Sequence, residues 1–195
     1  TAWLVEDHTI PFTALDIQIS GGTSLDHADQ RGAVNLMAAL LEEGAGELDA
    51  QGFANARDAL AARFSFGART DSISIYAQFL TENRDEAVDL LRLAINEPRF
   101  DADAVERVRG QVLANIQSNL KSPESIAASE FDRLTFGTHP YASDGDGTME
   151  SVSSLSRADI VDAFQGAISR DRLYVAATGD ITADQLGTLL DTLLG

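Results

Sequence analysis

Few residues of this chain have the type and spacing that metal or nucleophilic chemistry requires. The three histidines, His8, His27 and His139, lie in predicted turns, and none has a second histidine four residues away. The sequence therefore lacks the pair of imidazoles, one helical turn apart, with which a helix chelates zinc. We interpret His8 and His27 as surface residues and expect His139 to pack against Tyr141; a compensating metal site assembled from the three histidines is the alternative.

Other catalytic patterns are also absent from the sequence. No G-x-S-x-G segment marks a serine nucleophile, and there is no cysteine to serve as a nucleophile or as a thiolate ligand. Gly21-Gly22 lacks the further glycines and the lysine of a phosphate-binding loop. Glu42 and Glu43 are consecutive and point about 100° apart on a helix, so a solvated pair is expected rather than an acid/base pair.

The stretch from Arg31 to Gly44 is the segment around which the rest of the chain is organised. It reads as an apolar helix that ends at a glycine, and Asn35 is its only polar residue between Gly32 and Glu42. One helical face carries Val34, Met37, Leu40 and Leu41. The local pattern therefore predicts a packed core helix, capped at its start by Asp26 or Asp29.

Composition limits the classes of protein to which the chain can belong. Its 195 residues, 44% of them apolar, suffice for one domain with a substantial core. The formal charge of −17, from 31 acidic and 14 basic residues, argues against nucleic acid and anionic membranes as partners. No apolar run approaches the ~18 residues of a membrane span, so we expect a soluble protein without membrane insertion, compatible with a bacterial periplasm or cytoplasm.

The order of predicted elements indicates a two-layer α+β fold, with a mainly antiparallel sheet covered on one face by several helices. Strands are expected over residues 2–5, 12–19, 63–68, 72–79 and 173–178. Helices are expected over residues 31–44, 48–62, 83–96, 101–120, 123–136, 156–168 and 182–194. A loop that contains His139-Pro140-Tyr141 precedes the helix that Ser156 caps.

Local sequence within this order resembles one domain of the pitrilysin or insulinase family of zinc metallopeptidases, the inverzincins. The matching segments are Ile10-Pro11, Gly21-Gly22-Thr23-Ser24-Leu25-Asp26, Gly32, Glu97-Pro98-Arg99-Phe100 and Gly179-Asp180. The resemblance covers essentially all of residues 1–195, which it implies are a single metallopeptidase-like domain. It also implies that a second, similar domain follows and is absent from this chain.

In catalytic members of that family the central helix carries H-x-x-E-H, and a later helix supplies a further glutamate ligand. Aligning Gly32 with the glycine before the motif places Asn35 and Ala39 at the two histidines and Ala38 at the general base. The distal ligand falls on Asn115, which is 115 − 39 = 76 positions beyond Ala39. Alanine has no donor atom and amide oxygens are weak zinc ligands, so the resemblance implies a degenerate half without a metal or other cofactor of its own.

The resemblance implies that such a half pairs with a catalytic member that carries H-x-x-E-H and zinc, either as a heterodimer or as a fused half. The two halves would enclose a chamber that degrades or processes peptides, and the acidic surface would favour basic peptides. Two alternatives stay open: a structural or peptide-binding scaffold with no protease role, and an active zinc peptidase. For peptide binding the candidate is the edge strand with Phe66, Gly67, Ala68 and Arg69, which lacks the Asn-Ala pair of catalytic halves.

Overall fold

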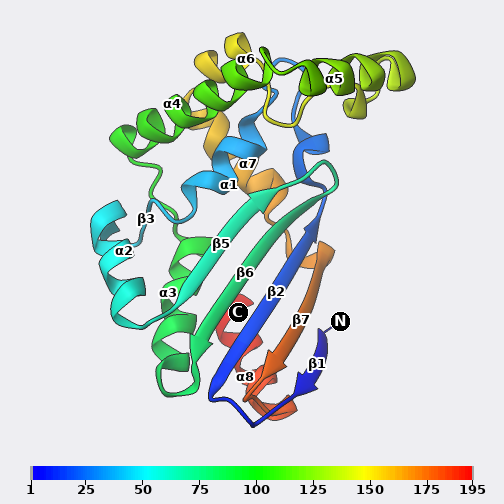
Figure 1. Ribbon diagram of the computed structural model, residues 1–195. Helices are drawn as coiled ribbons and strands as arrows, with labels where there is room; N and C mark the ends of the chain where they lie inside the picture. The colour runs from blue at the N-terminus through cyan, green and yellow to red at the C-terminus, as the bar shows by residue number, and fades with distance from the viewer. Residues whose placement is uncertain (1, 195) are drawn as a thin grey trace.

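Alternation of apolar and polar residues builds the main sheet of the domain. The computed structural model describes residues 2–194, and its five-stranded sheet has the order β1-β7-β2-β6-β5 (Figure 1). Only β1 and β7 run parallel; the other three neighbouring pairs are antiparallel. The strands are β1 (Ala2–Glu6), β2 (Phe12–Ser20), β5 (Arg63–Ala68), β6 (Ser72–Leu80) and β7 (Leu173–Gly179).

The residue pattern of the central strand β2 explains why one face of the sheet is buried. Leu15, Ile17 and Ile19 are buried, whereas Asp16 between them is exposed. Ile17 lies opposite Ile75 on β6. Such cross-strand apolar pairs fix the register, because a slip by one residue would turn the apolar side chains into water.

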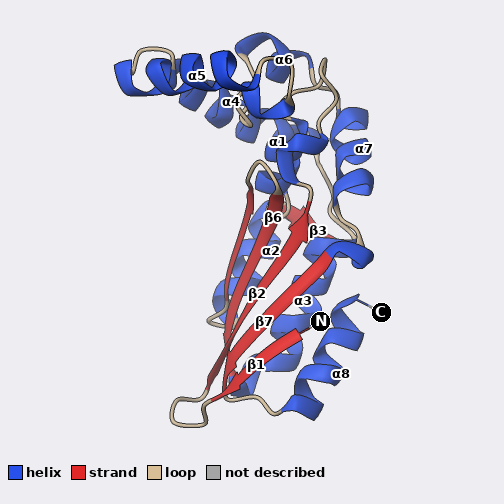
Figure 2. Ribbon diagram, turned by 90° about the vertical axis from the view of Figure 1, so that its right-hand side faces the viewer, coloured by secondary structure: helices blue, strands red, loops and turns tan. Residues whose placement is uncertain are grey.

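Helices cover one face of this sheet and gather at one of its ends. Helices α3 and α8 pack against the apolar face, while the described residues leave the opposite face open (Figure 2). At one end of the sheet, α1 packs against α7 and α4, and α5 projects beyond the open face (Figure 2). The helices are α1 (Ala33–Leu40), α2 (Ala50–Ala59), α3 (Arg84–Asn96), α4 (Ala102–Asn119), α5 (Pro123–Phe136), α6 (Met149–Ser154), α7 (Arg157–Ala167) and α8 (Ala183–Leu194). None of the helices within residues 2–194 is long and apolar enough to cross a bilayer.

The predicted fold class is confirmed, and two local differences have physical causes. The central helix ends at Leu40, before the predicted glycine stop, because the chain then forms a two-residue ladder of β3 (Gly44–Ala45) with β4 (Leu48–Asp49). Gly44 has φ +120°, a conformation that favours glycine. The short helix α6 was not predicted; its six residues give little periodicity, and its start is fixed by a reciprocal cap between Thr148 and Ser151.

The start of α1 depends on a buried carboxylate that lies outside the helix. Asp26 Oδ2 accepts a hydrogen bond from the Gly32 N–H and Oδ1 accepts one from the Val34 N–H, both at 2.9 Å. The sequence offered Asp26 and Asp29 as caps of this helix. Asp26 accepts the hydrogen bonds, whereas Asp29 is exposed. Burial raises the pKa of Asp26, although the two N–H groups and the Arg31 guanidinium act in the opposite direction. Together these contacts orient the helix that carries the candidate site.

We expect Asp26→Ala to lower the free energy of unfolding by about 2–4 kcal/mol, because it leaves two buried N–H groups without their acceptor and removes the negative charge beside the buried Arg31 guanidinium. Asp29→Ala, in the same loop, is the matched control and should change stability by less than about 0.5 kcal/mol. Urea unfolding monitored by circular dichroism measures both. Equal stabilities for the two variants would show that the Asp26 carboxylate does not hold the helix.

Candidate functional site

Helix α1 presents two of the predicted site positions on one face. Asn35 and Ala39 are one helical turn apart and half-buried, whereas Ala38 is fully buried. Asn115 lies on the neighbouring helix α4, where it is exposed. The aligned positions thus sit on two helices that pack together, and Ala38 faces the protein interior rather than a cleft.

The side-chain amide of Asn35 is already engaged. Its Nδ2 donates to Asp146 Oδ1 at 3.0 Å, across 111 positions of sequence. Burial raises the pKa of Asp146, and the neighbouring charge of Asp144 adds to the effect. The sequence indicated only turn residues in this loop, so Asp146 was missed as a partner of the site. An amide pair between Asn35 and Asn115, an obvious replacement for a shared metal, does not occur among the hydrogen bonds of residues 2–194.

These residues do not fit the zinc ion that catalytic relatives of this fold would hold. Ala38 and Ala39 have no donor atoms, and the Asn35 N–H points at a carboxylate. Zinc prefers imidazole, thiolate and carboxylate ligands, usually three from the protein in a catalytic site. Within residues 2–194, no group of three or more His, Cys, Asp or Glu side chains is arranged to hold a metal. The side chains at α1 therefore do not supply the ligands that a zinc ion with an activated water would need.

A buried arginine fixes the loop that carries Asp146. Arg31 is 9% exposed, and its Nη1 donates to the Thr23 carbonyl and lies 3.8 Å from Asp26 Oδ2. Its Nη2 donates at 3.3–3.5 Å to the backbone carbonyls of Pro140, Ser143 and Asp144. The guanidinium has five donors in a planar fork, which suits this shell of carbonyl oxygens. It thereby ties the loop 140–147 to the start of α1 and holds Asp146 in reach of Asn35.

The histidines have separate surroundings. His8 Nδ1 lies 2.7 Å from Asp180 Oδ1, and this hydrogen bond raises the pKa of the imidazole. His139 packs edge-on against Tyr141 with ring centroids 4.5 Å apart, which confirms the predicted contact. His27 is exposed beside the start of α1.

The predicted peptide-binding strand lies at a free edge. Among residues 2–194, strand β5 pairs only with β6 and is the last strand of the sheet, while Arg69 follows it in the turn. The Arg69 N–H donates inward to the Ser72 carbonyl at 2.7 Å. Because successive N–H groups of a strand alternate in direction, those of Phe66 and Ala68 point to the free edge, and that of Gly67 points to β6.

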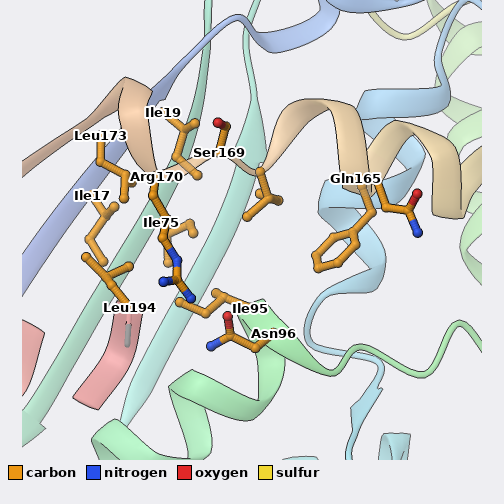
Figure 3. A pocket seen from close by; sticks show the side chains of 12 residues that line it. Ile17, Ile19, Ile75, Ile95, Asn96, Gln165, Ser169, Arg170, Leu173 and Leu194 are labelled. Carbon is orange, nitrogen blue, oxygen red and sulfur yellow. The ribbon is translucent and has the colours of Figure 1, made fainter. Parts of the chain in front are cut away.

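An apolar cavity lies elsewhere, on the helix-covered side of the sheet. It measures about 170 Å³ and is enclosed by the ends of α3, α7 and α8 (Figure 3). Its wall is mainly aliphatic, with Ile17, Ile19, Ile75 and Ile95 among the labelled side chains. Asn96, at its rim, donates to the carbonyls of Arg92 and Leu193. Gln165, Ser169 and Arg170 also line the cavity, which shares no lining residue with the α1 site (Figure 3).

Comparison with known proteins places these features in a family. The profile of insulinase, peptidase family M16, matches residues 1–144. The "Non-peptidase homolog YmxG" of Helicobacter pylori is 30% identical over 180 residues, which is 92% of this chain and 42% of that protein. An "Uncharacterized zinc protease" of Mycobacterium leprae is 27% identical over 91% of this chain and 40% of its own length.

A solved structure with the same fold is also a member of family M16. The crystal structure of a peptidase M16 inactive domain from Pseudomonas fluorescens superposes with a TM-score of 0.93 at 27% identity, covering 98% of this chain and 47% of that one. The chain thus spans less than half the length of the relatives it matches. By its profile match and its relatives, the chain belongs to the insulinase family of peptidases, family M16.

Proposed function

We propose that this chain is a non-catalytic domain of the M16 family that pairs with a zinc-bearing half to form a chamber for peptides. The observation that carries the proposal is the set of side chains on α1. The proposal aligns Asn35 and Ala39 with the zinc ligands of catalytic members, and the Asn35 amide donates a hydrogen bond to Asp146. Zinc is supplied in this proposal by the partner, which carries the intact H-x-x-E-H motif.

The relatives support this proposal in different ways. Two of them are described as a non-peptidase homolog and as an inactive domain, whereas a third is described as a zinc protease. Family membership alone therefore does not decide activity. Activity depends on the residues at the metal positions. In this chain the aligned residues lack the imidazole and carboxylate groups that bind zinc.

The open face of the sheet supports the chamber part of the proposal. It carries Trp3 stacked on Tyr174, with ring centroids 6.3 Å apart, and the exposed Tyr76. Helix α5 projects on the same side, so the described residues form a corner (Figure 2). A sheet face with exposed aromatic side chains offers a peptide both apolar contacts and polar edges.

We expect peptidase activity only when this chain is mixed with the H-x-x-E-H-bearing family member of the same organism. The chain alone should be inactive, because the positions of the base and ligands hold Ala38, Ala39 and Asn35. Hydrolysis of a fluorogenic basic peptide by each protein and by the mixture measures this. A stable complex whose activity equals that of the partner alone would indicate a scaffold instead, and activity of this chain alone would overturn the proposal.

We also propose that the free edge of β5 pairs with an extended peptide in the assembled chamber. The support is the place of β5 at the edge of the sheet and the outward N–H groups of Phe66 and Ala68. Main-chain pairing at such an edge gives affinity without requiring one side-chain sequence.

Ala68→Pro should weaken binding of an extended peptide by about tenfold, because it removes one outward N–H and the hydrogen bond that this group would donate. Ala68→Ser keeps the N–H and is the matched control. Fluorescence anisotropy with a labelled peptide and the assembled complex gives both affinities. If the proline variant folds and binds as tightly as the serine variant, the peptide does not pair with this edge.

A further inference from the structure

Two arginines at the free edge of the sheet have uncommitted side chains. Arg63 begins strand β5 and Arg69 follows its end, and both are exposed (Figure 1). Within residues 2–194 the other arginines have partners, such as the carboxylates that Arg57 and Arg107 contact, but these two form neither an ion pair nor a side-chain hydrogen bond. Because the chain has 31 acidic and 14 basic residues, two unmatched cations at one edge are unexpected.

Both arginines belong to the open face of the sheet. Arg63 lies opposite Gln78 of β6, whereas the next residue, Phe64, is buried under the sheet. The Arg69 N–H continues the ladder by donating to the Ser72 carbonyl at 2.7 Å. Side chains alternate along a strand, so positions 63, 65, 67 and 69 share the face that is free of helices (Figure 2). The six positions that separate the arginines correspond to about 20 Å of extended chain.

The acidic residues that are near these arginines in sequence have other partners. Asp58 is paired with Arg57 at 3.1 Å, and the Asp71 carboxylate accepts a hydrogen bond from the Tyr141 hydroxyl at 2.6 Å. At physiological ionic strength, exposed charges more than about 8 Å away are largely screened. The formal charge of −17 therefore favours basic peptides at long range, while direct contact with this edge favours acidic side chains.

The surface between the two arginines is small and uncharged. Ser65 is exposed, and a Cβ added at Gly67 would meet only the Ser74 Oγ, at 3.4 Å. Since the N–H groups of Phe66 and Ala68 point to the free edge, positions 63, 65, 67 and 69 fall in the non-hydrogen-bonded pairs of an antiparallel partner strand. Side chains approach each other most closely in such pairs. Each arginine would therefore contact the residue directly opposite it on an added strand.

The two charges also restrict what can occupy the edge. A segment that covered β5 permanently would bury unpaired cations, which is costly, whereas exposed charges are typical of an edge strand that meets water. Antiparallel pairing with a second copy, centred on Phe66, would set Arg63 of one copy opposite Arg69 of the other. Like charges in opposed positions destabilise a sheet. The edge therefore favours a separate peptide that brings carboxylates.

We propose that the free edge of β5 selects an extended peptide with two acidic side chains six positions apart, one opposite Arg63 and the other opposite Arg69. This inference rests on the proposed pairing of a peptide with β5, and it names the side chains that such a peptide carries. The planar guanidinium group suits a carboxylate, because two of its N–H groups can donate to the two oxygens. Outside these two positions the peptide can carry basic residues.

The test measures binding of labelled peptides to the full chain by fluorescence anisotropy at low salt. The peptides share one β-prone sequence and carry Glu, Gln or Lys at two sites six positions apart. The Glu peptide should bind about tenfold more tightly than the Lys peptide, because opposed charges stabilise a sheet pair and like charges destabilise it. Higher salt should bring the three affinities together.

A charge-reversed variant and a control locate the effect. R63E/R69E should reverse the order of the peptides, so that the Lys peptide binds most tightly. Both side chains are exposed, and circular dichroism checks that the variant folds. Lys121→Glu, in the exposed turn between α4 and α5, also makes the chain more negative and should keep the order of the unaltered chain.

The outcomes separate this inference from the proposed pairing. Equal binding of the three peptides that Ala68→Pro weakens would overturn the charge selection and leave the pairing standing. Binding of the Glu peptide that Ala68→Pro leaves intact would place the carboxylates on the arginines without a paired strand, and it would overturn both. If no peptide binds, the arginines only guard the edge against association, and both proposals for β5 fail.

Discussion

The arrangement at the end of the sheet depends on one buried pair of charges, Asp26 and Arg31. The carboxylate holds the first N–H groups of α1, and the guanidinium holds the loop 140–147 by its carbonyl oxygens. Taking two charges out of water costs desolvation free energy. The attraction between the charges offsets this cost only when their remaining donors and acceptors are satisfied, as most of them are here. Removing either partner would leave the other charge buried, so loss of the pair is expected to destabilise this end of the domain.

The packing of α1 depends on apolar contacts and needs no bound metal. The core that supports α1 consists of aliphatic side chains such as Leu36 and Leu40, and it needs no ligand to stay packed. Asn35 keeps a polar contact by bonding to Asp146. If the metal positions on α1 have been vacated, as we propose, the domain can keep its shape without zinc chemistry. It still offers an open sheet face, a free strand edge and the exposed helix α5 (Figure 2).

Much of the fold was predictable because its signals are local. Alternation of apolar and polar residues predicted β2 and β6 and their solvent-exposed faces, and Pro123 predicted the start of α5. The contacts of the site were harder to predict from the sequence. The Asn35 to Asp146 hydrogen bond joins residues 111 positions apart, and the hydrogen-bond acceptors of Arg31 are backbone carbonyls, which no residue type reveals. The exposure of α5 depends on what its neighbours leave uncovered, so the pattern that predicted the helix did not predict its surface.

The central claim is that the metal positions on α1 and α4 have been vacated, and zinc content tests it most directly. Elemental analysis should be made on the unaltered chain and on N35H/A39H/N115E, which restores three ligands and leaves the fully buried Ala38 in place. After exposure to zinc and dialysis, we predict only trace zinc in the unaltered chain and one zinc per chain in the variant. One tightly held zinc in the unaltered chain would contradict the account, and a variant that folds but binds none would show that these three positions do not converge.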